Sequence, residues 1–247
     1  MKYRLTFLIA ALAVCSCAPS KSPGVVILVS ANAEWAALKE VLSPPPSRLE
    51  KTPYGEYFFR EITGGDGAAR QVLFFHGGWG KIDAAASTQY AITRWNPTLL
   101  VNIGTAGGFA GKARKGQILL VTRTVTYDIH ELMGDGAEAI DYYSSSPEAP
   151  IILDPEISRG IVVSADQDID PKNIPGLVRK YGAVAGDWES SAIAHVAKKN
   201  GTRLVILRGV SDIVDAKGSE TYGNLGAFEE ACRTIMKALL EKLPLIL

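Results

Sequence analysis

Short, continuous runs of aliphatic and β-branched residues recur along this chain, and helical segments follow most of them. The first run, Val25–Ser30, reads VVILVS, and similar runs are Leu99–Ile103, Gln117–Thr122 and Arg203–Leu207. Apolar runs without polar alternation are typical of strands that are buried on both faces of a sheet. A chain of this kind is therefore expected to form a three-layer α/β/α sandwich with a mixed central sheet.

The helices of this sandwich are indicated by apolar residues that recur at helical spacing. The predicted helices are Ala33–Leu42, Lys81–Trp95 and Glu189–Lys198, with an amphipathic closing helix at Leu225–Leu240. Because these helices alternate with strands, each connection can carry the chain back across the sheet, as in other α/β proteins.

Other segments predict a hairpin, two shorter strands and one long loop. Tyr57–Ile62 and Gln71–His76 flank a glycine-rich turn, which is a hairpin signal. Gly160–Ser164 and Ala183–Ala185 are shorter apolar pieces of the same sheet. Asp128–Pro150 is the longest irregular stretch, and long loops in compact enzymes often cover a site.

Composition places the chain among ordinary globular proteins. It has 247 residues, of which 47% are hydrophobic and 21% charged, and Lys plus Arg equals Asp plus Glu at 26 each. This length suits one large domain, predicted over residues 25–247. The charge balance and the lack of a basic stripe exclude a nucleic-acid partner. Its 3 histidines and 3 cysteines are scattered, so we expect no metal site, and no motif indicates a cofactor.

The N-terminus carries an export signal. Two positive charges in the first four residues precede the apolar run Leu5–Val14, which is too short to cross a bilayer. Residues 1–16 are predicted to be a lipoprotein-type signal peptide. Small Ser16 precedes Cys17, which we predict to carry the lipid, and residues 17–24 form a tether. The protein would then be exported and lipid-anchored to the periplasmic or cell-surface face of a bacterial membrane. An ordinary signal peptide and a misplaced start site on a cytosolic enzyme are the alternatives.

Acidic and glycine-rich segments follow the predicted strands directly. Glu34 follows the first strand, and further segments of this kind are Gly77–Lys81, Asn102–Gly108, Asp187–Glu189 and Arg208–Asp212. Ligands of open α/β folds bind at the carboxyl ends of the strands. A single carboxylate there is more often a helix cap, but three acids that converge on one sheet edge favour an acid-lined pocket.

At these positions the chain resembles the nucleoside phosphorylase family, in particular its nucleosidase branch, which includes methylthioadenosine/S-adenosylhomocysteine nucleosidase. The resemblance runs from about Val25 to the C-terminus and keeps the motifs in order. The matching segments are Ser30–Glu34, Gly78–Lys81, Asn102–Gly108, Glu189 with Ala192–Val196, and Ser211–Asp212.

The chemistry that this resemblance implies is hydrolysis of the N-glycosidic bond of a purine nucleoside by water. Asp212 would be the general acid that protonates the purine at N7, and Ser211 would hold it in place. Glu34 would be the base that activates water, and Glu189 would accept hydrogen bonds from the ribose hydroxyls.

The resemblance also implies a pocket for sugar and base, and a homodimer in which a partner side chain lies near that pocket. Further residues predicted to bind the substrate are Gly77, Gly78, Thr105, Ala106, Gly107, Ile169 and Trp188.

Three positions depart from the pattern of the nucleosidases. Asp168 stands where an aromatic residue stacks on the purine, Trp188 stands in place of a methionine, and Gly77 replaces a serine. These changes indicate a reshaped pocket, unless the alignment shifts locally. Trp35 and Trp79 flank the loops and could supply the stacking surface, although packing in the core is the role we predict for both.

The choice between water and phosphate depends on the charges near Glu34. Phosphorylases of the family place an arginine where this chain has Asn102, and they carry further arginines in the first loop. That loop, Ser30–Trp35, has no arginine here, so a phosphate dianion would meet Glu34 without a local cation. We therefore predict hydrolysis. The alternatives are a phosphate-dependent phosphorylase, to which a partner subunit could donate an arginine, and a non-catalytic nucleoside-binding lipoprotein.

Overall fold

The computed structural model describes residues 23–247, and these form a nine-stranded sheet. The predicted signal peptide and Cys17 lie outside the described residues. The strand order is β2-β3-β4-β1-β5-β8-β7-β6-β9, and β9 pairs with β5 as well. The strands are β1 (Val25–Val29), β2 (Glu50–Lys51), β3 (Glu56–Thr63), β4 (Ala69–His76), β5 (Leu99–Phe109), β6 (Ile118–Thr126), β7 (Ile157–Ser164), β8 (Ala183–Asp187) and β9 (Leu204–Val214).

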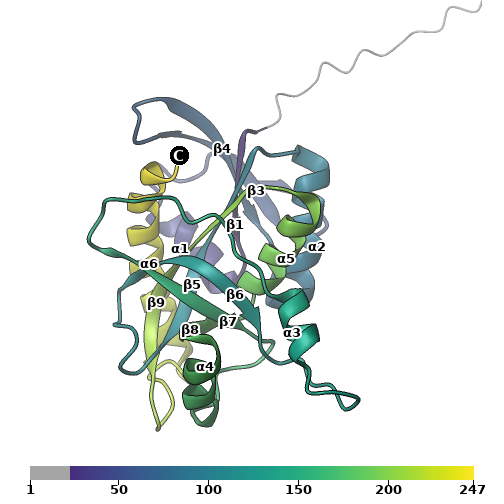
Figure 1. Cartoon of the computed structure of the whole chain (residues 1–247). Helices are drawn as coiled ribbons and strands as arrows, with labels where there is room; N and C mark the ends of the chain where they lie inside the picture. The colour runs from purple at the N-terminus through teal and green to yellow at the C-terminus, as the bar shows by residue number, and fades with distance from the viewer. Residues whose placement is uncertain (1–22) are drawn as a thin grey trace, which may run out of the picture.

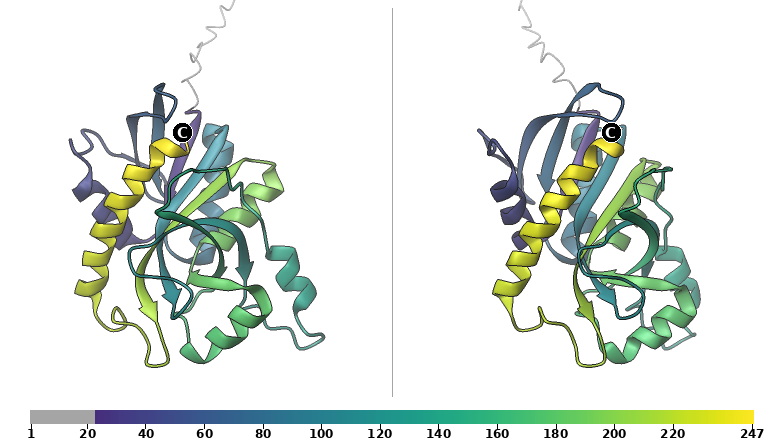
Figure 2. Two further views of the ribbon diagram at one scale, coloured as in Figure 1. Left: turned by 60° about the vertical axis from the view of Figure 1, so that its left-hand side comes forward. Right: turned by 90° about the vertical axis from the view of Figure 1, so that its left-hand side faces the viewer.

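Helices cover both faces of this sheet, which confirms the predicted sandwich. In Figures 1 and 2, α1 and α6 lie on one side of the sheet and α2 and α5 on the other. The helices are α1 (Asn32–Val41), α2 (Gly80–Trp95), α3 (Ala137–Tyr143), α4 (Ile174–Tyr181), α5 (Ser190–Asn200) and α6 (Leu225–Lys242), with short 3-10 segments at Pro171–Asn173 and Leu243–Leu245. Among residues 23–247, no helix is both long and apolar enough to cross a membrane.

The sheet is mixed, as predicted, and part of it closes on itself. β1 runs parallel to β4 and β5, whereas β3 and β4 form the expected antiparallel hairpin. The strands β5, β8, β7, β6 and β9 pair in succession, and β9 returns to pair with β5, so these strands form a ring. This ring brings the ends of β5, β7, β8 and β9 together around one space.

Alternation along β1 shows how the two helical layers share the core. Val25, Ile27 and Val29 pack toward the cluster that contains α1 and α6. Val26 and Leu28 pack toward the cluster that contains α2 and α5. Each such side chain contributes about 1.5–3 kcal/mol when it is fully removed from water. β1 is therefore held from both sides, and it fixes the start of α1 rigidly beside the sheet.

The structure differs from the sequence prediction in two ways: two strands are longer than expected, and two helices were not predicted. β5 and β9 run on to Phe109 and Val214, because they pair with each other through the glycine-rich and acidic motifs that were expected to be loops. α3 interrupts the stretch predicted to be irregular, and α4 was not predicted at all. Pro175 and Gly176 obscure α4 in the sequence, but proline is tolerated in the first turn of a helix because its missing N–H is not needed there.

Candidate active site

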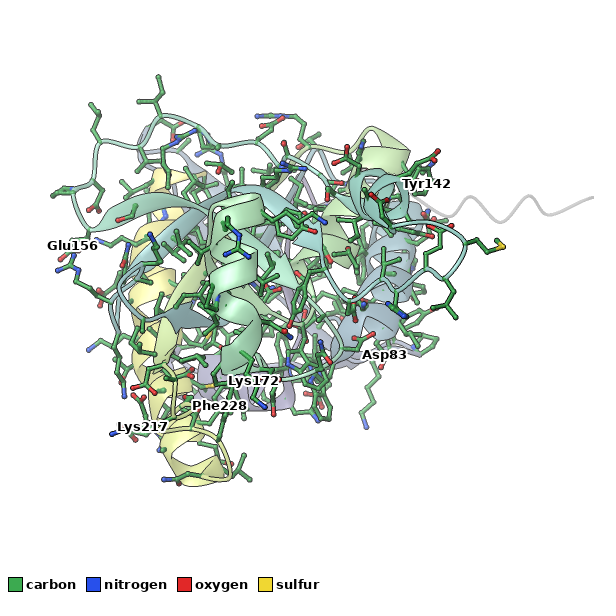
Figure 3. The ribbon with its side chains drawn as sticks, turned by 60° about the horizontal axis from the view of Figure 1, so that its bottom comes forward. Asp83, Tyr142, Glu156, Lys172, Lys217 and Phe228 are labelled. Atoms are coloured by element: carbon green, nitrogen blue, oxygen red, sulfur yellow. The ribbon has the colours of Figure 1, made fainter. Side chains whose placement is uncertain are left out.

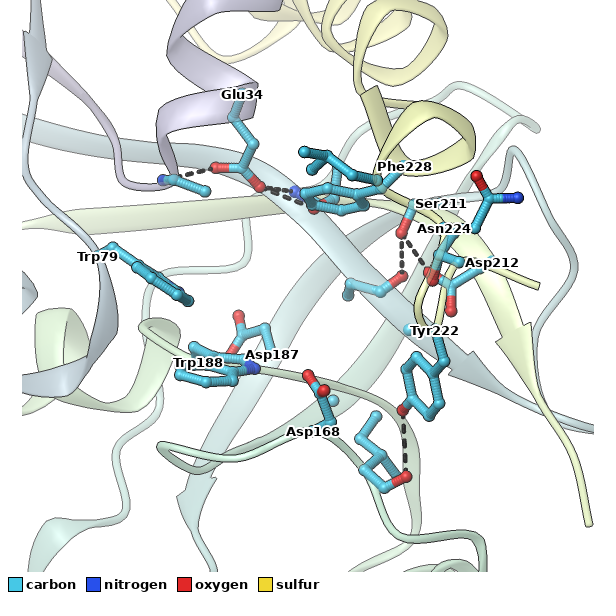
Figure 4. A pocket seen from close by; sticks show the side chains of 18 of the residues that line it. Glu34, Trp79, Asp168, Asp187, Trp188, Ser211, Asp212, Tyr222, Asn224 and Phe228 are labelled. Atoms are coloured by element: carbon cyan, nitrogen blue, oxygen red, sulfur yellow. Dashed lines mark hydrogen bonds between the residues drawn. The ribbon is translucent and has the colours of Figure 1, made fainter. Parts of the chain in front are cut away.

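A cavity of about 510 Å³ lies at the carboxyl ends of the strands, within the size range of small-molecule sites. Residues that follow β1, β7 and β8, the far halves of β5 and β9, and the segment 221–228 form its wall. Figure 3 looks at this end of the molecule, where Phe228 of α6 and Asp83 of α2 are labelled. Figure 4 shows the cavity from close by.

Glu34 is fixed at the buried end of the cavity by hydrogen bonds from two directions. Its Oε1 accepts from the Thr105 backbone N–H at 2.5 Å and from the Thr105 hydroxyl at 2.8 Å. Its Oε2 accepts from the Ala31 N–H at 3.2 Å, which closes the first turn of α1. The carboxylate is buried and lines the cavity, so it has a defined orientation toward a ligand.

A buried arginine lies behind Glu34, and the prediction of no local cation is therefore wrong. Arg208 of β9 is fully buried, and its Nη1 lies 4.0 Å from Glu34 Oε1. Its Nε lies 2.8 Å from Asp187 Oδ2, and its Nη2 donates to Asn102 Oδ1 at 2.8 Å. Nη1 has no hydrogen-bond partner among the described residues. The prediction failed because β9 supplies this arginine from a distant part of the sequence, not from the first loop.

The close approach of Arg208 to β5 requires glycine at position 104. A Cβ at Gly104 would lie 2.1 Å from Arg208 Nη1 and 2.8 Å from Glu34 Oε1. Burial opposes the charge of Arg208, but the carboxylates of Asp187, Glu34 and Glu189 outweigh it and raise the pKa of the guanidinium. Arg208 is thus permanently charged within a group of acids.

Glu189 completes the buried end of the cavity. Burial raises the pKa of Glu189 to about 8; Arg208 lowers it in part, and the neighbouring carboxylates of Glu34 and Asp187 raise it. Glu189 Oε1 accepts from the Gly80 N–H at 3.1 Å, which ties it to the start of α2. At neutral pH Glu189 is therefore mainly a neutral acid, able to donate as well as accept a hydrogen bond.

A bulge presents Asp212 and Ser211 together to the cavity. In the pairing of β5 with β9, Ala106 is opposite Val210 and Gly107 is opposite Asp212, so Ser211 is the extra residue. Consecutive residues of a regular strand face opposite sides, but both of these line the cavity. The Ser211 hydroxyl donates to Asp212 Oδ1 at 2.6 Å. The Ser219 hydroxyl, from the segment after β9, donates to Asp212 Oδ2.

Most of the other residues predicted for the pocket lie in its wall. Thr105, Ala106, Gly107, Ile169 and Trp188 all line the cavity. The glycines of the Gly77–Lys81 loop do not, contrary to the prediction. A Cβ at Gly77 would meet the Ser87 hydroxyl at 2.9 Å, and one at Gly78 would meet Asp83, so a side chain at either position would collide with α2.

Two tryptophans form one wall of the cavity. The rings of Trp79 and Trp188 are 5.3 Å apart and tilted by 30°, and both are labelled in Figure 4. Trp79 is 59% exposed, so the predicted core role is wrong for this residue. Trp35 is in the core as predicted, stacked on His76 at 5.3 Å.

The sequence did not reveal the contribution of the segment after β9. Tyr222 and Phe228 line the cavity, and the Tyr222 hydroxyl donates to the Ile169 backbone carbonyl at 3.1 Å. The only sequence signal for a role of these aromatic residues in the pocket is that they follow Asp212 at a short distance. Within residues 23–247, no group of three or more His, Cys, Asp or Glu side chains is arranged to hold a metal ion.

A second polar cluster fixes the rim of the cavity. Lys81 Nζ pairs with the carboxylate of Asp128 and lies 3.8 Å from Asp166 Oδ2. Asp166 Oδ1 accepts from the Lys81 backbone N–H at 2.7 Å. These contacts join the start of α2 to the segments that follow β6 and β7, so the loop that carries Trp79 and Gly80 is held from both ends.

The fold and this pocket define an α/β protein with an acid-lined site for a small molecule at the carboxyl edge of its sheet. Three acids and a buried arginine surround the closed end, and aromatic side chains line the more open end. Residues 25–243 match the family model of the Phosphorylase superfamily, and the chain belongs to this family. This match confirms the resemblance found in the sequence.

Two similar proteins and one solved structure match most of this chain. The chain is 26% identical to the 5'-methylthioadenosine/S-adenosylhomocysteine nucleosidase of Bacillus subtilis over 209 residues, which cover 78% of this chain and 89% of that protein. The nucleosidase of the same name from Anoxybacillus flavithermus is also 26% identical, with 80% and 89% covered. The solved nucleosidase structure from S. pneumoniae superposes with a TM-score of 0.69 at 18% identity, and covers 90% of this chain and 99% of that one.

Proposed function

We propose that this protein hydrolyses the N-glycosidic bond of a purine nucleoside of the 5'-methylthioadenosine or S-adenosylhomocysteine type. The observation that carries the proposal is that Glu34, Glu189 and Asp212 line one cavity, although they come from α1, the β8–α5 connection and β9. The curated relatives at 26% identity are nucleosidases for these compounds.

In the proposed reaction, water attacks the anomeric carbon while the bond from that carbon to the purine breaks. Glu34 takes a proton from the water, and Asp212 gives a proton to N7 of the purine, which leaves as a neutral base. Glu189 binds the ribose hydroxyls. The hydroxyl of Ser211 orients the Asp212 carboxyl toward the base, because it donates to Oδ1 at 2.6 Å.

Arg208 lies behind the closed end of the cavity. Its guanidinium is fully buried, and its Nη1 lies 4.0 Å from Glu34 Oε1. Arg208 therefore acts by positioning and countercharge behind Glu34, and Glu34 is the group that would contact the attacking water.

Hydrolysis is favoured over phosphorolysis by the charges that face the ligand. No lysine or arginine is among the described residues that line the cavity, and Arg208 already faces the carboxylates of Asp187 and Glu34. A phosphate dianion would therefore enter a negative site without a free cation. Water has no such penalty.

The proposal is tested by incubating the purified protein with 5'-methylthioadenosine in phosphate-free buffer and measuring released adenine. We expect release without phosphate and its loss in Asp212→Asn, with Asp215→Asn as a matched control outside the cavity. Release that depends strictly on added phosphate would establish the phosphorylase instead. Binding without any turnover would establish the non-catalytic binding protein.

We also propose that the protein is exported and anchored to a bacterial membrane through a lipid on Cys17. The support is the sequence alone: a charged start, the apolar run Leu5–Val14, and a cysteine preceded by a small residue. In cells fed a labelled fatty acid, Cys17→Ser should abolish labelling and release the protein from the membrane fraction. Cys15→Ser is the matched control and should keep both, whereas labelling that survives Cys17→Ser would reject the anchor.

We further propose a homodimer that forms beside the mouth of the cavity. Trp79 lies in the wall, and Ile82, one turn along α2, is 82% exposed. Leu132 and Met133 are 88% and 95% exposed in the loop that Asp128 ties to Lys81. Figure 3 shows Asp83 and Tyr142, from α2 and α3, along the same side of the molecule.

Light scattering tests this dimer. The variant Ile82→Asp should give monomers, and the control Ile151→Asp should not. Monomers of the parent protein at every concentration would exclude the dimer.

A further inference from the structure

Glu189 lies in a two-residue connection, between the end of β8 at Asp187 and the start of α5 at Ser190. Its carboxylate is buried but accepts only one hydrogen bond from the described residues, from the Gly80 N–H at 3.1 Å. This residue is at the N-cap position of α5, yet its side chain makes no capping hydrogen bond. The direction of the Glu189 carboxylate is therefore set by its backbone, and the backbone is held by the residues on either side.

Asp187, on one side of Glu189, is fixed by several hydrogen-bond donors. Its Oδ1 accepts from the Ser164 hydroxyl at 2.6 Å and from the Ser190 backbone N–H at 3.3 Å. Its Oδ2 accepts from the Ser190 hydroxyl and lies 2.8 Å from Arg208 Nε. The residues before and after the connection are thus bonded directly to each other, and the connection is closed into a tight turn.

Ser190, on the other side of Glu189, contacts the same arginine. Its hydroxyl is fully buried and accepts from Arg208 Nε at 2.8 Å while it donates to Asp187. Arg208 is itself held by Asn102 Oδ1 at 2.8 Å, and the amide nitrogen of Asn102 donates to a backbone carbonyl of β1 at 3.0 Å. Both neighbours of Glu189 are therefore tied to the central strands β9, β5 and β1.

We propose that Asp187 and Ser190 are positioning residues that hold Glu189 in the orientation in which it binds the ribose hydroxyls. This inference rests on the proposed hydrolysis and states how one of its binding groups is set in place. A hydrogen bond weakens steeply when its angle departs from linearity, so the carboxylate must keep one orientation to accept from the sugar. Contacts of Glu189 itself are too few to fix that orientation, whereas its two neighbours make many.

The first test compares two neighbouring hydroxyls on α5. Ser190→Ala removes the hydroxyl that joins Asp187 to Arg208, whereas Ser191→Ala removes a buried hydroxyl that has no hydrogen-bond partner among the described residues. We expect Ser190→Ala to raise KM for 5'-methylthioadenosine about tenfold and to keep kcat within about threefold, as the loss of a hydrogen bond to charged groups that supports ground-state binding implies. Ser191→Ala should change neither quantity. Equal KM values in the parent protein and Ser190→Ala would overturn the inference.

A double-mutant cycle shows whether Ser190 acts through Glu189. All proteins in the cycle carry Glu34→Gln, so that the nucleoside is not consumed, and calorimetry gives the Kd for 5'-methylthioadenosine. In this background Ser190→Ala should raise Kd about tenfold. When Glu189→Ala is also present, the same change should raise Kd less than about twofold, because no carboxylate remains to be positioned. An equal effect with and without the Glu189 carboxylate would mean a general loss of structure and would overturn the inference.

Asp187 has a separate signature in the pH dependence of binding. The charged groups that face Glu189 are Arg208, which lowers its pKa, and the carboxylates of Glu34 and Asp187, which raise it. Asp187→Asn removes one of the charges that raise this pKa, whereas Ser190→Ala changes no charge. In the Glu34→Gln background, the change of Kd with pH should therefore move to lower pH in Asp187→Asn and stay in place in Ser190→Ala. A transition at the same pH in both variants would contradict the role of Asp187 beside Glu189.

The cycle also separates the failure of this inference from the failure of the proposed function, because it measures binding and not turnover. If the parent protein hydrolyses no nucleoside but the effect of Ser190→Ala disappears without the Glu189 carboxylate, the nucleosidase proposal fails and the positioning stands. If hydrolysis occurs but the effect of Ser190→Ala is the same with and without that carboxylate, the positioning fails and the nucleosidase proposal stands.

Discussion

The two ends of the cavity are built on different physical principles. At the closed end, Glu34, Asp187 and Arg208 are buried and held by hydrogen bonds from β5, β9 and α1. At the open end, Trp79 is 59% exposed and Asp168 has no hydrogen-bond or ion-pair partner among the described residues. The closed end is preorganised for one chemical step, because its groups cannot move without loss of several contacts at once. The open end is held by few contacts, so its side chains can differ between relatives without damage to the fold.

The largest expected effect is on the closed end, in the variant Glu34→Gln. Loss of the base that activates water should lower kcat by about 1,000-fold, within the range for general acid–base groups. Because glutamine can still accept from Thr105, the melting temperature should change little. Steady-state kinetics and thermal denaturation measure the two quantities. A variant that keeps more than a tenth of the parent kcat would remove Glu34 from the mechanism.

The second prediction compares a buried with an exposed arginine. Arg208→Met leaves the carboxylates of Glu34 and Asp187 without their buried countercharge, and should lower the free energy of unfolding by about 3–5 kcal/mol. Arg203→Met breaks a solvated pair with Glu148, and should cost less than about 1 kcal/mol. Urea denaturation of both variants gives the difference. Equal losses would mean that the closed end is not the rigid half of the site.

The third prediction concerns the pH dependence of stability at Glu189. Its pKa rises from 4.5 in the unfolded chain to about 8 in the folded protein, so unfolding releases a proton between these values. The contribution of Glu189 to the free energy of unfolding is greatest below pH 4.5, and it decreases as the pH rises toward 8. Glu189→Gln should therefore stabilise the protein at pH 8, on the order of 4 kcal/mol, and change little at pH 4.5. Melting temperatures that shift equally at both values would contradict the raised pKa.

The smallest effect is expected at the open end, in Trp79→Ala. Loss of one half-exposed indole face should raise KM a few-fold, about 1 kcal/mol or less, and leave kcat nearly unchanged. The same change at Trp35, which is buried against His76, should instead lower stability by about 3–5 kcal/mol. If Trp79→Ala lowered kcat as strongly as Glu34→Gln, the contrast between the two ends would not hold.

The sequence predicted the fold well because hydrophobic periodicity is a local signal. The run at Val25–Val29 and the helical spacing of α1 and α2 follow directly from side-chain burial. The ring formed by β5 and β9 was not predictable, since strand pairing between distant segments leaves no pattern in either of them. The same limit hid Arg208, whose sequence position gives no sign that its guanidinium reaches Glu34.

The candidate site also contains some residues that the sequence could predict and others that it could not. Glu34, Glu189 and Asp212 could be named from the sequence because each follows a recognisable strand and belongs to a family motif. Gly77 and Gly78 were placed in the wall because a glycine-rich loop permits close approach to a ligand, but neither is among the residues that line the cavity, and their lack of a side chain makes room for α2. Asp168 was visible as a departure from the family, and only the cavity shows that it stands beside a tryptophan wall.

The most direct test of the account is to run the reaction of 5'-methylthioadenosine in water enriched in ¹⁸O, with and without phosphate. Mass spectrometry of the sugar product reads out which nucleophile attacked the anomeric carbon. Attack by water activated at Glu34 predicts one ¹⁸O atom in the free sugar and a rate that phosphate does not change. A sugar 1-phosphate without ¹⁸O, formed only when phosphate is present, would contradict the account.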